Sequence, residues 1–182
     1  QRCFFPAAQG AMGYAIPAIL GAYFSGRGNI VCVVGDGSIM MNMQELGIIK
    51  AYNIPVKILV INNNMYSVIR KRQTDLFKNR TIGNDPTDGV PAPNFKLIAG
   101  SVGINYRKIV SLSELESNVK SMFADDCETI LYEILSTPDQ KYFHESYALT
   151  EKRKLVHRPI EDLSPFLDRD VFRNEMIVEP LE

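Results

Sequence analysis

Two strongly apolar runs of the sequence each end in side chains that carry oxygen atoms. The first run ends at Asp36, which stands between two glycines, and the second ends at three consecutive asparagines, residues 62–64. Carboxylate and amide oxygens, together with nearby backbone carbonyls, form a hard ligand set that suits Mg²⁺ or Ca²⁺ better than Zn²⁺. Because one carboxylate and neutral amides bind a cation weakly, a diphosphate is needed to complete such a site.

The glycines beside Asp36 favour a phosphate partner. Gly35 and Gly37 let the backbone bend and approach a bulky anion, and the N–H groups that follow are able to meet phosphate oxygens. Asp-Gly pairs are also common in hairpin turns and asparagines in loops, although a helix-length segment separates these two runs. The stretch "GDGSIM" lacks the third glycine of a dinucleotide fingerprint, and there is no P-loop motif. The residues alone leave a metal–phosphate site and an ordinary loop open.

The elements that would position these side chains form a strand–helix–strand unit. Residues 30–34 and 56–61 are β-branched runs, which indicates buried strands, the first of them covered on both faces as in a parallel sheet. Asn42 is expected to cap a helix over residues 43–52 between them. Such a unit brings the carboxyl ends of both strands to one edge of the sheet, where ligands bind in open α/β folds.

The same alternation continues along the chain and predicts an α/β fold with a doubly wound, mainly parallel sheet and helices on both faces. We expect a domain over residues 1–136 and an irregular C-terminal arm over residues 137–182. The further expected elements are helices over residues 7–23, 65–73, 94–103 and 111–124, a long polar loop over residues 74–93, and strands over residues 106–110 and 128–135.

Composition narrows the class of protein further. The 182 residues are 46% hydrophobic and 23% charged with a formal net charge of −1, so no basic excess points to nucleic acid or to an acidic membrane surface. No run reaches the length of a membrane span and no signal peptide is visible, so a cytoplasmic protein is expected. Cys3, Cys32 and Cys127 form no CxxC pair, and Cys32 is interpreted as a buried structural thiol.

Residues 35–70, "GDGSIMMNMQELGIIKAYNIPVKILVINNNMYSVIR", strongly resemble the cofactor domain of acetolactate synthase and related thiamine-diphosphate-dependent enzymes. Asp36 and Asn63 stand 27 positions apart, which is similar to the spacing of the family's GDG and NN motifs. The upstream segment "GAMGYAIPAILGA" resembles the family's G-x-M-G segment. The resemblance covers residues 3–135.

The resemblance implies a ligand set for the cation and for the diphosphate. The side chains of Asp36 and Asn63 and the backbone carbonyl of Met65 would ligate Mg²⁺ together with two diphosphate oxygens. The diphosphate itself would lie against the GDGS motif, whose members in this role are Gly35, Gly37 and Ser38.

The same resemblance assigns the other end of the cofactor to the G-x-M-G segment. The carbonyl of Gly10 would accept a hydrogen bond from the aminopyrimidine, and Met12 would lie beneath the cofactor and impose its bent shape. Ordinary core packing of Met12 is the alternative, and the sequence alone does not separate the two.

No catalytic residue is assigned on this chain, because the glutamate that activates the cofactor in the family lies in a pyrimidine-binding domain. Glu45 matches a structural position of the family. The chain is therefore expected to be inactive alone, as a fragment of a longer chain, which its start at Gln1 favours, or as the partner of a second subunit. A homodimer or tetramer is implied, and FAD binding in a domain outside this chain is left open.

The implied reaction is decarboxylation of a small 2-oxo acid followed by carboligation. A simple 2-oxo acid decarboxylase and a non-catalytic module that keeps the fold are the alternatives. Val68 and Arg72 match positions that border the substrate channel in acetolactate synthases, which commonly carry other residues there. The basic residues 70–72 are able to offer a cation to an anionic substrate, but a solvated helix face explains them equally well. No catalytic role is assigned to His144 or His157.

Overall fold

The structure, a computed structural model, describes residues 2–6, 9–90, 93–124, 128–140, 147–149, 155–163 and 166–179. The chain divides into two compact units. Unit 1 comprises Gln1–Ser67 and Ile82–Pro138, and unit 2 comprises Val68–Thr81 and Asp139–Glu182. The expected domain boundary after residue 136 stays a prediction.

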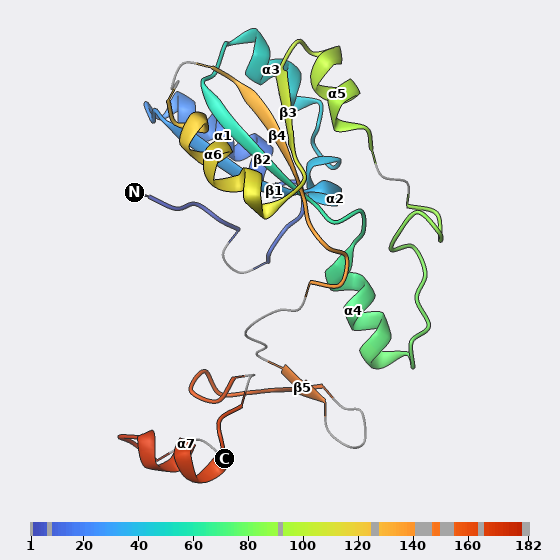
Figure 1. Ribbon diagram of the computed structural model, residues 1–182, viewed down its shortest axis with the longest axis vertical. Coiled ribbons are helices and arrows are strands. Elements are labelled where there is room, and N and C mark those ends of the chain that lie inside the picture. The colour runs from blue at the N-terminus through green and yellow to red at the C-terminus, as the bar shows by residue number, and fades with distance from the viewer. Residues whose placement is uncertain are drawn as a thin grey trace. The chain divides into compact units, whose positions relative to one another are not determined.

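A four-stranded parallel sheet forms the centre of unit 1 (Figure 1). Its strands lie in the order β1-β2-β4-β3, with β2 and β4 in the middle. The strands are β1 (Ile30–Gly35), β2 (Val56–Asn62), β3 (Asn105–Ile109) and β4 (Ile130–Leu135). The prediction of an α/β fold with a mainly parallel sheet is confirmed.

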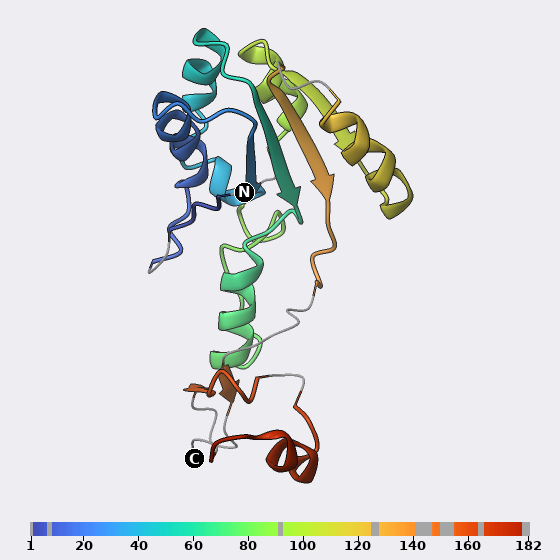
Figure 2. The same cartoon turned by 90° about the vertical axis from the view of Figure 1, so that its left-hand side faces the viewer.

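Helices pack on both faces of this sheet (Figure 2). Three of them, α1 (Ala15–Phe24), α3 (Glu45–Ala51) and α5 (Phe95–Ser101), share one apolar core with β1, β2 and β4. On the opposite face, α6 (Leu112–Met122) packs against β3 and β4 in a smaller core. Among the described residues, no helix combines the length and the apolar character that crossing a bilayer requires.

The expectation that β1 is covered on both faces is wrong. Cys32 and Val34 are buried, but Val31 and Val33 on the other face are exposed by 42% and 61%. β1 stands at an edge of the sheet, where α1 packs on one face only. In contrast, β2 lies between two strands and is buried on both faces along most of its length.

Two helix starts also differ from the prediction. The first helix begins at Ala15 rather than at residue 7, because Gly13 has a left-handed φ of 84°, which a helix cannot continue through. Asn42 does not cap α3, which begins at Glu45; its side chain binds the Gly13 backbone instead. The predicted cap of α5 is confirmed, since the side chain of Asn94 accepts a hydrogen bond from a backbone N–H of the first turn.

Unit 2 contains one helix before the predicted C-terminal arm, and two short strands and a helix within it. It holds most of helix α4 (Ser67–Leu76), which lies where the short helix after residue 65 is predicted. β5 (Tyr147–Leu149) pairs antiparallel with β6 (Leu155–His157), and helix α7 (Arg169–Glu175) is capped by the side chain of Asp168.

Candidate functional site

The carboxyl ends of β1 and β2 meet at one edge of the sheet, as the sequence predicts. Asp36 follows β1 directly and opens a single helical turn, α2 (Asp36–Ile39). Its buried carboxylate accepts hydrogen bonds from two backbone N–H groups, Gly37 to Oδ1 at 2.9 Å and Asn64 to Oδ2 at 2.7 Å. The aspartate after the first strand therefore holds the turn that follows the second.

The side chains of Asn62, the last residue of β2, and of Asn63 form that turn. Oδ1 of Asn62 accepts a hydrogen bond from the backbone N–H of Asn64 at 2.9 Å, and Oδ1 of Asn63 accepts one from Met65 at 3.2 Å. Asn64 has a left-handed φ of 60°, which asparagine tolerates better than most residues. The run is thus a pair of overlapping Asx turns, and its geometry sets where the Met65 backbone lies.

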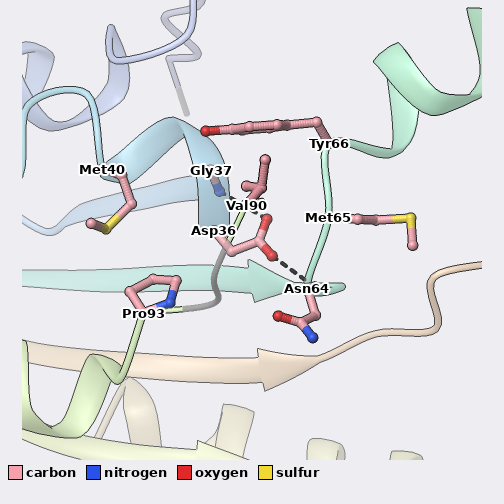
Figure 3. A pocket seen from close by; sticks show the side chains of 8 residues that line it. All are labelled: Asp36, Gly37, Met40, Asn64, Met65, Tyr66, Val90 and Pro93. Atoms are coloured by element: carbon pink, nitrogen blue, oxygen red, sulfur yellow. Dashed lines mark hydrogen bonds between the residues drawn. The ribbon is translucent and has the colours of Figure 1, made fainter. Parts of the chain in front are cut away.

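A pocket opens beside Asp36 (Figure 3). The Asp36 carboxylate, Asn64 and Met65 border it, and the ring of Tyr66 lies over Gly37. Asn63 is half-buried and is not among the lining residues, so its predicted role as a metal ligand stays a prediction. The lining residues are Asp36, Gly37, Met40, Asn64, Met65, Tyr66, Val90 and Pro93.

Gly37 is required by packing. A Cβ atom at Gly37 would lie 2.0 Å from Cε1 of Tyr66, whereas one at Gly35 would meet nothing within 4 Å. Tyr66 is in turn held by its backbone N–H, which donates to the carbonyl of Asn84 at 2.8 Å. The polar stretch over residues 74–93, predicted as a long loop, therefore contributes to the pocket in two ways. It holds the Tyr66 backbone in place, and its own Val90 lines the pocket. Sequence reasoning did not identify Tyr66.

The G-x-M-G segment is fastened to the same edge of the sheet. The backbone N–H of Gly13 donates to Oγ of Ser38 at 3.0 Å, and Nδ2 of Asn42 donates to the Gly13 carbonyl at 2.9 Å. Core packing does not explain Met12, whose side chain is 44% exposed. Gly10 is also exposed and has a φ of 56°. The structure thus brings Gly13 and Ser38 together, although they lie 25 positions apart.

Burial raises the pKa of the Asp36 carboxyl above its usual value, while the backbone N–H groups of Gly37, Asn64 and Met65 oppose this shift. The buried charge is only partly compensated by these donors, so a cation beside the carboxylate would stabilise its ionised form. Together with the amide and carbonyl oxygens of the turn, this donor set fits a hard divalent cation.

The remaining predicted residues lie elsewhere in the chain. Val68 is exposed and Arg72 is half-buried on α4, and their predicted place beside the substrate stays a prediction. Lys71 of the same helix pairs with Asp75 at 2.8 Å. His157 lies in β6, whereas His144 and Cys127 fall outside the described residues.

Cys32 behaves as the buried structural thiol that the sequence predicts. It is a free cysteine with a 6% exposed side chain, and burial raises the pKa of its thiol to about 12. The thiol therefore stays protonated, and a protonated thiol is a poor nucleophile and a poor metal ligand.

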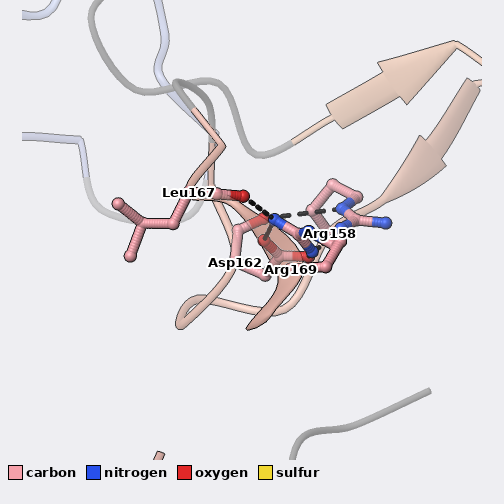
Figure 4. Close-up of polar contacts among 4 residues, drawn as sticks. All are labelled: Arg158, Asp162, Leu167 and Arg169. Carbon is pink, nitrogen blue, oxygen red and sulfur yellow. Dashed lines mark hydrogen bonds and ion pairs between the residues drawn. The ribbon is translucent and has the colours of Figure 1, made fainter. Parts of the chain in front are cut away.

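Unit 2 holds a buried carboxylate of its own, Asp162 (Figure 4). It forms ion pairs with Arg158 and with Arg169, the latter through two contacts of 2.9 Å. Arg169 also donates to the carbonyl of Leu167 at 2.9 Å. Because both carboxylate oxygens of Asp162 are engaged, this cluster is explained by the folding of unit 2.

Residues 1–132 match the protein family described as "Thiamine pyrophosphate enzyme, C-terminal TPP binding domain". The acetolactate synthase large subunit of Porphyra purpurea is 39% identical over 112 residues, which are 61% of this chain and 19% of that protein. The acetolactate synthase isozyme 2 large subunit of Escherichia coli (strain K12) is 33% identical over 124 residues, 68% of this chain and 22% of that protein. The chain thus spans about a fifth of the length of these curated relatives.

A solved structure is similar in fold as well as in sequence. It is the Rhodococcus jostii RHA1 thiamine diphosphate-dependent 4-hydroxybenzoylformate decarboxylase, which matches with a TM-score of 0.61 and 28% sequence identity. The match covers 74% of this chain and 24% of that protein.

A first test concerns the attachment of the G-x-M-G segment. Gly13→Ala should lower the stability of the full-length protein by about 1–3 kcal/mol, because the residue has a positive φ and its Cβ would lie 2.7 Å from Nδ2 of Asn42. The matched control is Gly21→Ala within α1, whose Cβ would meet nothing within 4 Å. This control should stabilise by about 0.5–1 kcal/mol. If both substitutions shifted the thermal unfolding temperature in the same direction, the packing role assigned to Gly13 would be contradicted.

Proposed function

The chain belongs to the thiamine pyrophosphate enzyme family and contains its C-terminal cofactor-binding domain, in a form related to acetolactate synthase; on that premise we propose that it binds thiamine diphosphate through Mg²⁺ for decarboxylation of a small 2-oxo acid followed by carboligation. One observation carries the proposal. The buried Asp36 carboxylate and the turn after β2 border one pocket at the carboxyl edge of a parallel sheet.

In this proposal the metal is held by residues at the two strand ends. Asp36 and Asn63 supply side-chain oxygens, and Met65 supplies its backbone carbonyl. The pocket that Asp36 and Met65 line supports this assignment, as do the hard oxygen donors, which suit Mg²⁺.

The diphosphate would lie along Gly35, Gly37 and Ser38. The Ser38 hydroxyl accepts a hydrogen bond from the Gly13 backbone and still has its own proton to donate to an anion. The backbone carbonyl of Gly10 would accept a hydrogen bond from the aminopyrimidine, and the exposed Met12 side chain would support the cofactor from below.

When bound, thiamine diphosphate supplies the nucleophilic carbon that adds to the 2-oxo acid and accepts the electrons released with carbon dioxide. The residues of this chain bind and orient that cofactor. The activating glutamate is assigned to a pyrimidine-binding domain of the same protein or of a partner subunit, so this chain alone should be inactive. We further propose that the full-length protein is a cytoplasmic homodimer or tetramer. The proposal includes no FAD site on this chain and leaves FAD binding in another domain open.

A simple 2-oxo acid decarboxylase is the second candidate function. The solved structure described above is a decarboxylase, which favours this alternative, whereas the two sequence relatives are acetolactate synthases. Val68 and Arg72 are proposed to border the substrate, and neither decides between the two reactions.

Removal of the Asp36 carboxylate tests the metal assignment. In the full-length protein, Asp36→Ala should weaken Mg²⁺-dependent binding of thiamine diphosphate about a hundredfold or more, as expected from a loss of about 3 kcal/mol. Calorimetric titration measures this loss. Glu116→Ala removes one carboxylate from an exposed pair on α6 and should leave the affinity unchanged. Equal affinity of Asp36→Ala and the wild type would refute the assignment.

Gly37 provides a test of the diphosphate side. Gly37→Ala should lower the affinity for thiamine diphosphate at least about tenfold, a cost of about 1.4 kcal/mol, because the new methyl group displaces the Tyr66 ring. Gly47→Ala in α3, whose Cβ would meet nothing within 4 Å, is the control. Undiminished affinity in Gly37→Ala would show that this strand end does not contact the cofactor.

Product analysis separates the two candidate reactions. The full-length protein with thiamine diphosphate, Mg²⁺ and pyruvate alone should consume two pyruvate molecules for each carbon dioxide released and form a ligated hydroxy-oxo acid. Release of one carbon dioxide per pyruvate, with acetaldehyde as the product, would instead favour the simple decarboxylase. Nuclear magnetic resonance of the reaction mixture distinguishes these products directly.

A further inference from the structure

Glu133 is a buried carboxylate in the middle of the sheet that the proposed function does not use. It lies on β4 beside Val60 of β2 and is 6% exposed. A buried carboxylate costs free energy unless its oxygens are hydrogen-bonded or paired. Glu133 lies near the strand ends, on the sheet face that carries the larger core, so its carboxylate needs polar partners there.

The two oxygens of Glu133 have different partners. Oε2 accepts a hydrogen bond from the hydroxyl of Tyr106, and Oε1 accepts one from Nδ2 of Asn62 at 2.7 Å. The ammonium group of Lys108 lies 3.8 Å from Oε1 and partly compensates the charge. Tyr106 and Lys108 both belong to β3, whereas Asn62, the last residue of β2, contacts Glu133 through Oε1.

The contact with Oε1 determines which way the Asn62 amide points. A carboxylate only accepts hydrogen bonds, so the NH₂ end of the amide must face Glu133. Oδ1 of Asn62 is then directed to the backbone N–H of Asn64, at 2.9 Å. The opposite orientation would set two acceptors against each other at Glu133 and two donors against each other at Asn64.

The Asn64 N–H also donates to the Asp36 carboxylate at 2.7 Å. A continuous chain of hydrogen bonds therefore runs from Glu133 through Asn62 and Asn64 to Asp36. The geometry points to Glu133 as a positioning residue for the proposed Mg²⁺ site, one that orients the Asn62 amide and thereby holds the turn carrying Asn63 and Met65. This inference rests on the proposed function.

The position of Glu133 separates this role from a catalytic one. Glu133 does not line the pocket beside Asp36, and both of its oxygens are engaged by neighbouring strands. Groups that orient metal ligands from outside the coordination shell typically contribute a factor of ten to a hundred in metal affinity. The expected effect of Glu133 is therefore on Mg²⁺ binding.

The test compares Mg²⁺ affinities of full-length variants at saturating thiamine diphosphate. Glu133→Leu should weaken Mg²⁺ binding about ten- to a hundredfold. Glu133→Gln should stay close to the wild type, because its carbonyl oxygen still accepts from Asn62 while its NH₂ group donates to Tyr106. Tyr106→Phe is the control, since it breaks the other hydrogen bond of the same carboxylate, and it should lower thermal stability without changing Mg²⁺ affinity.

A purely structural role predicts a different pattern. Glu133→Leu would then lose stability but keep wild-type Mg²⁺ affinity, or Glu133→Gln would be as defective as Glu133→Leu, and either result overturns the inference. If Glu133→Leu does not fold, Asn62→Ala replaces it. That variant should show the same ten- to hundredfold loss of Mg²⁺ affinity, and wild-type affinity in Asn62→Ala would overturn the inference. Absence of Mg²⁺-dependent cofactor binding in the wild type would instead refute the proposed function itself.

Discussion

The backbone N–H of Asn64 is shared by two acceptors, the carboxylate of Asp36 and the side-chain oxygen of Asn62. This shared donor joins the end of β1 to the end of β2, and the geometry of the pocket depends on it. The same residue has a left-handed φ of 60°, so the chain turns directly after this shared donor. A hydrogen bond that joins the ends of two neighbouring strands in this way requires parallel strands. Only in parallel strands do both carboxyl ends lie at the same edge of the sheet.

The strand register sets the spacing between the two buried carboxylates at this edge. Gly35 pairs with Ile61 and Val60 pairs with Glu133, so Asp36, which follows β1, and Glu133, on β4, lie on opposite sides of β2. Asn62, at the end of β2, uses its NH₂ group on one side and its oxygen on the other. The neutral amide of Asn62 thus lies between the carboxylates of Glu133 and Asp36, to which it is linked directly and through the Asn64 N–H. This arrangement avoids the repulsion of adjacent carboxylates.

The strand ends and their polar residues were predictable because β-branched runs and the asparagine and aspartate that follow them are local signals. The roles of Asn42 and Tyr66 were not predictable. Asn42 acts through the backbone of Gly13, and Tyr66 fills the space that Gly37 leaves. A lone glutamate within the apolar run "ILYEIL" is a signal for Glu133 that sequence reasoning did not use. The exposed face of β1 was not predictable, because burial depends on which elements pack on a strand and not on its composition.

The polar groups that line or brace this pocket divide into two kinds. Asp36, with the turn after β2, is suited to holding a cation, whereas Asn42 fixes the Gly13 backbone and Glu133 orients the Asn62 amide. Ser38 belongs to both kinds, because its hydroxyl accepts from the Gly13 backbone and keeps a proton to donate. Under the proposed function, none of these contacts would distinguish one 2-oxo acid from another, since they would hold only the diphosphate and the metal. In that proposal, substrate choice would come from residues that contact the reacting end of the cofactor, and changes at this edge of the sheet would weaken cofactor binding.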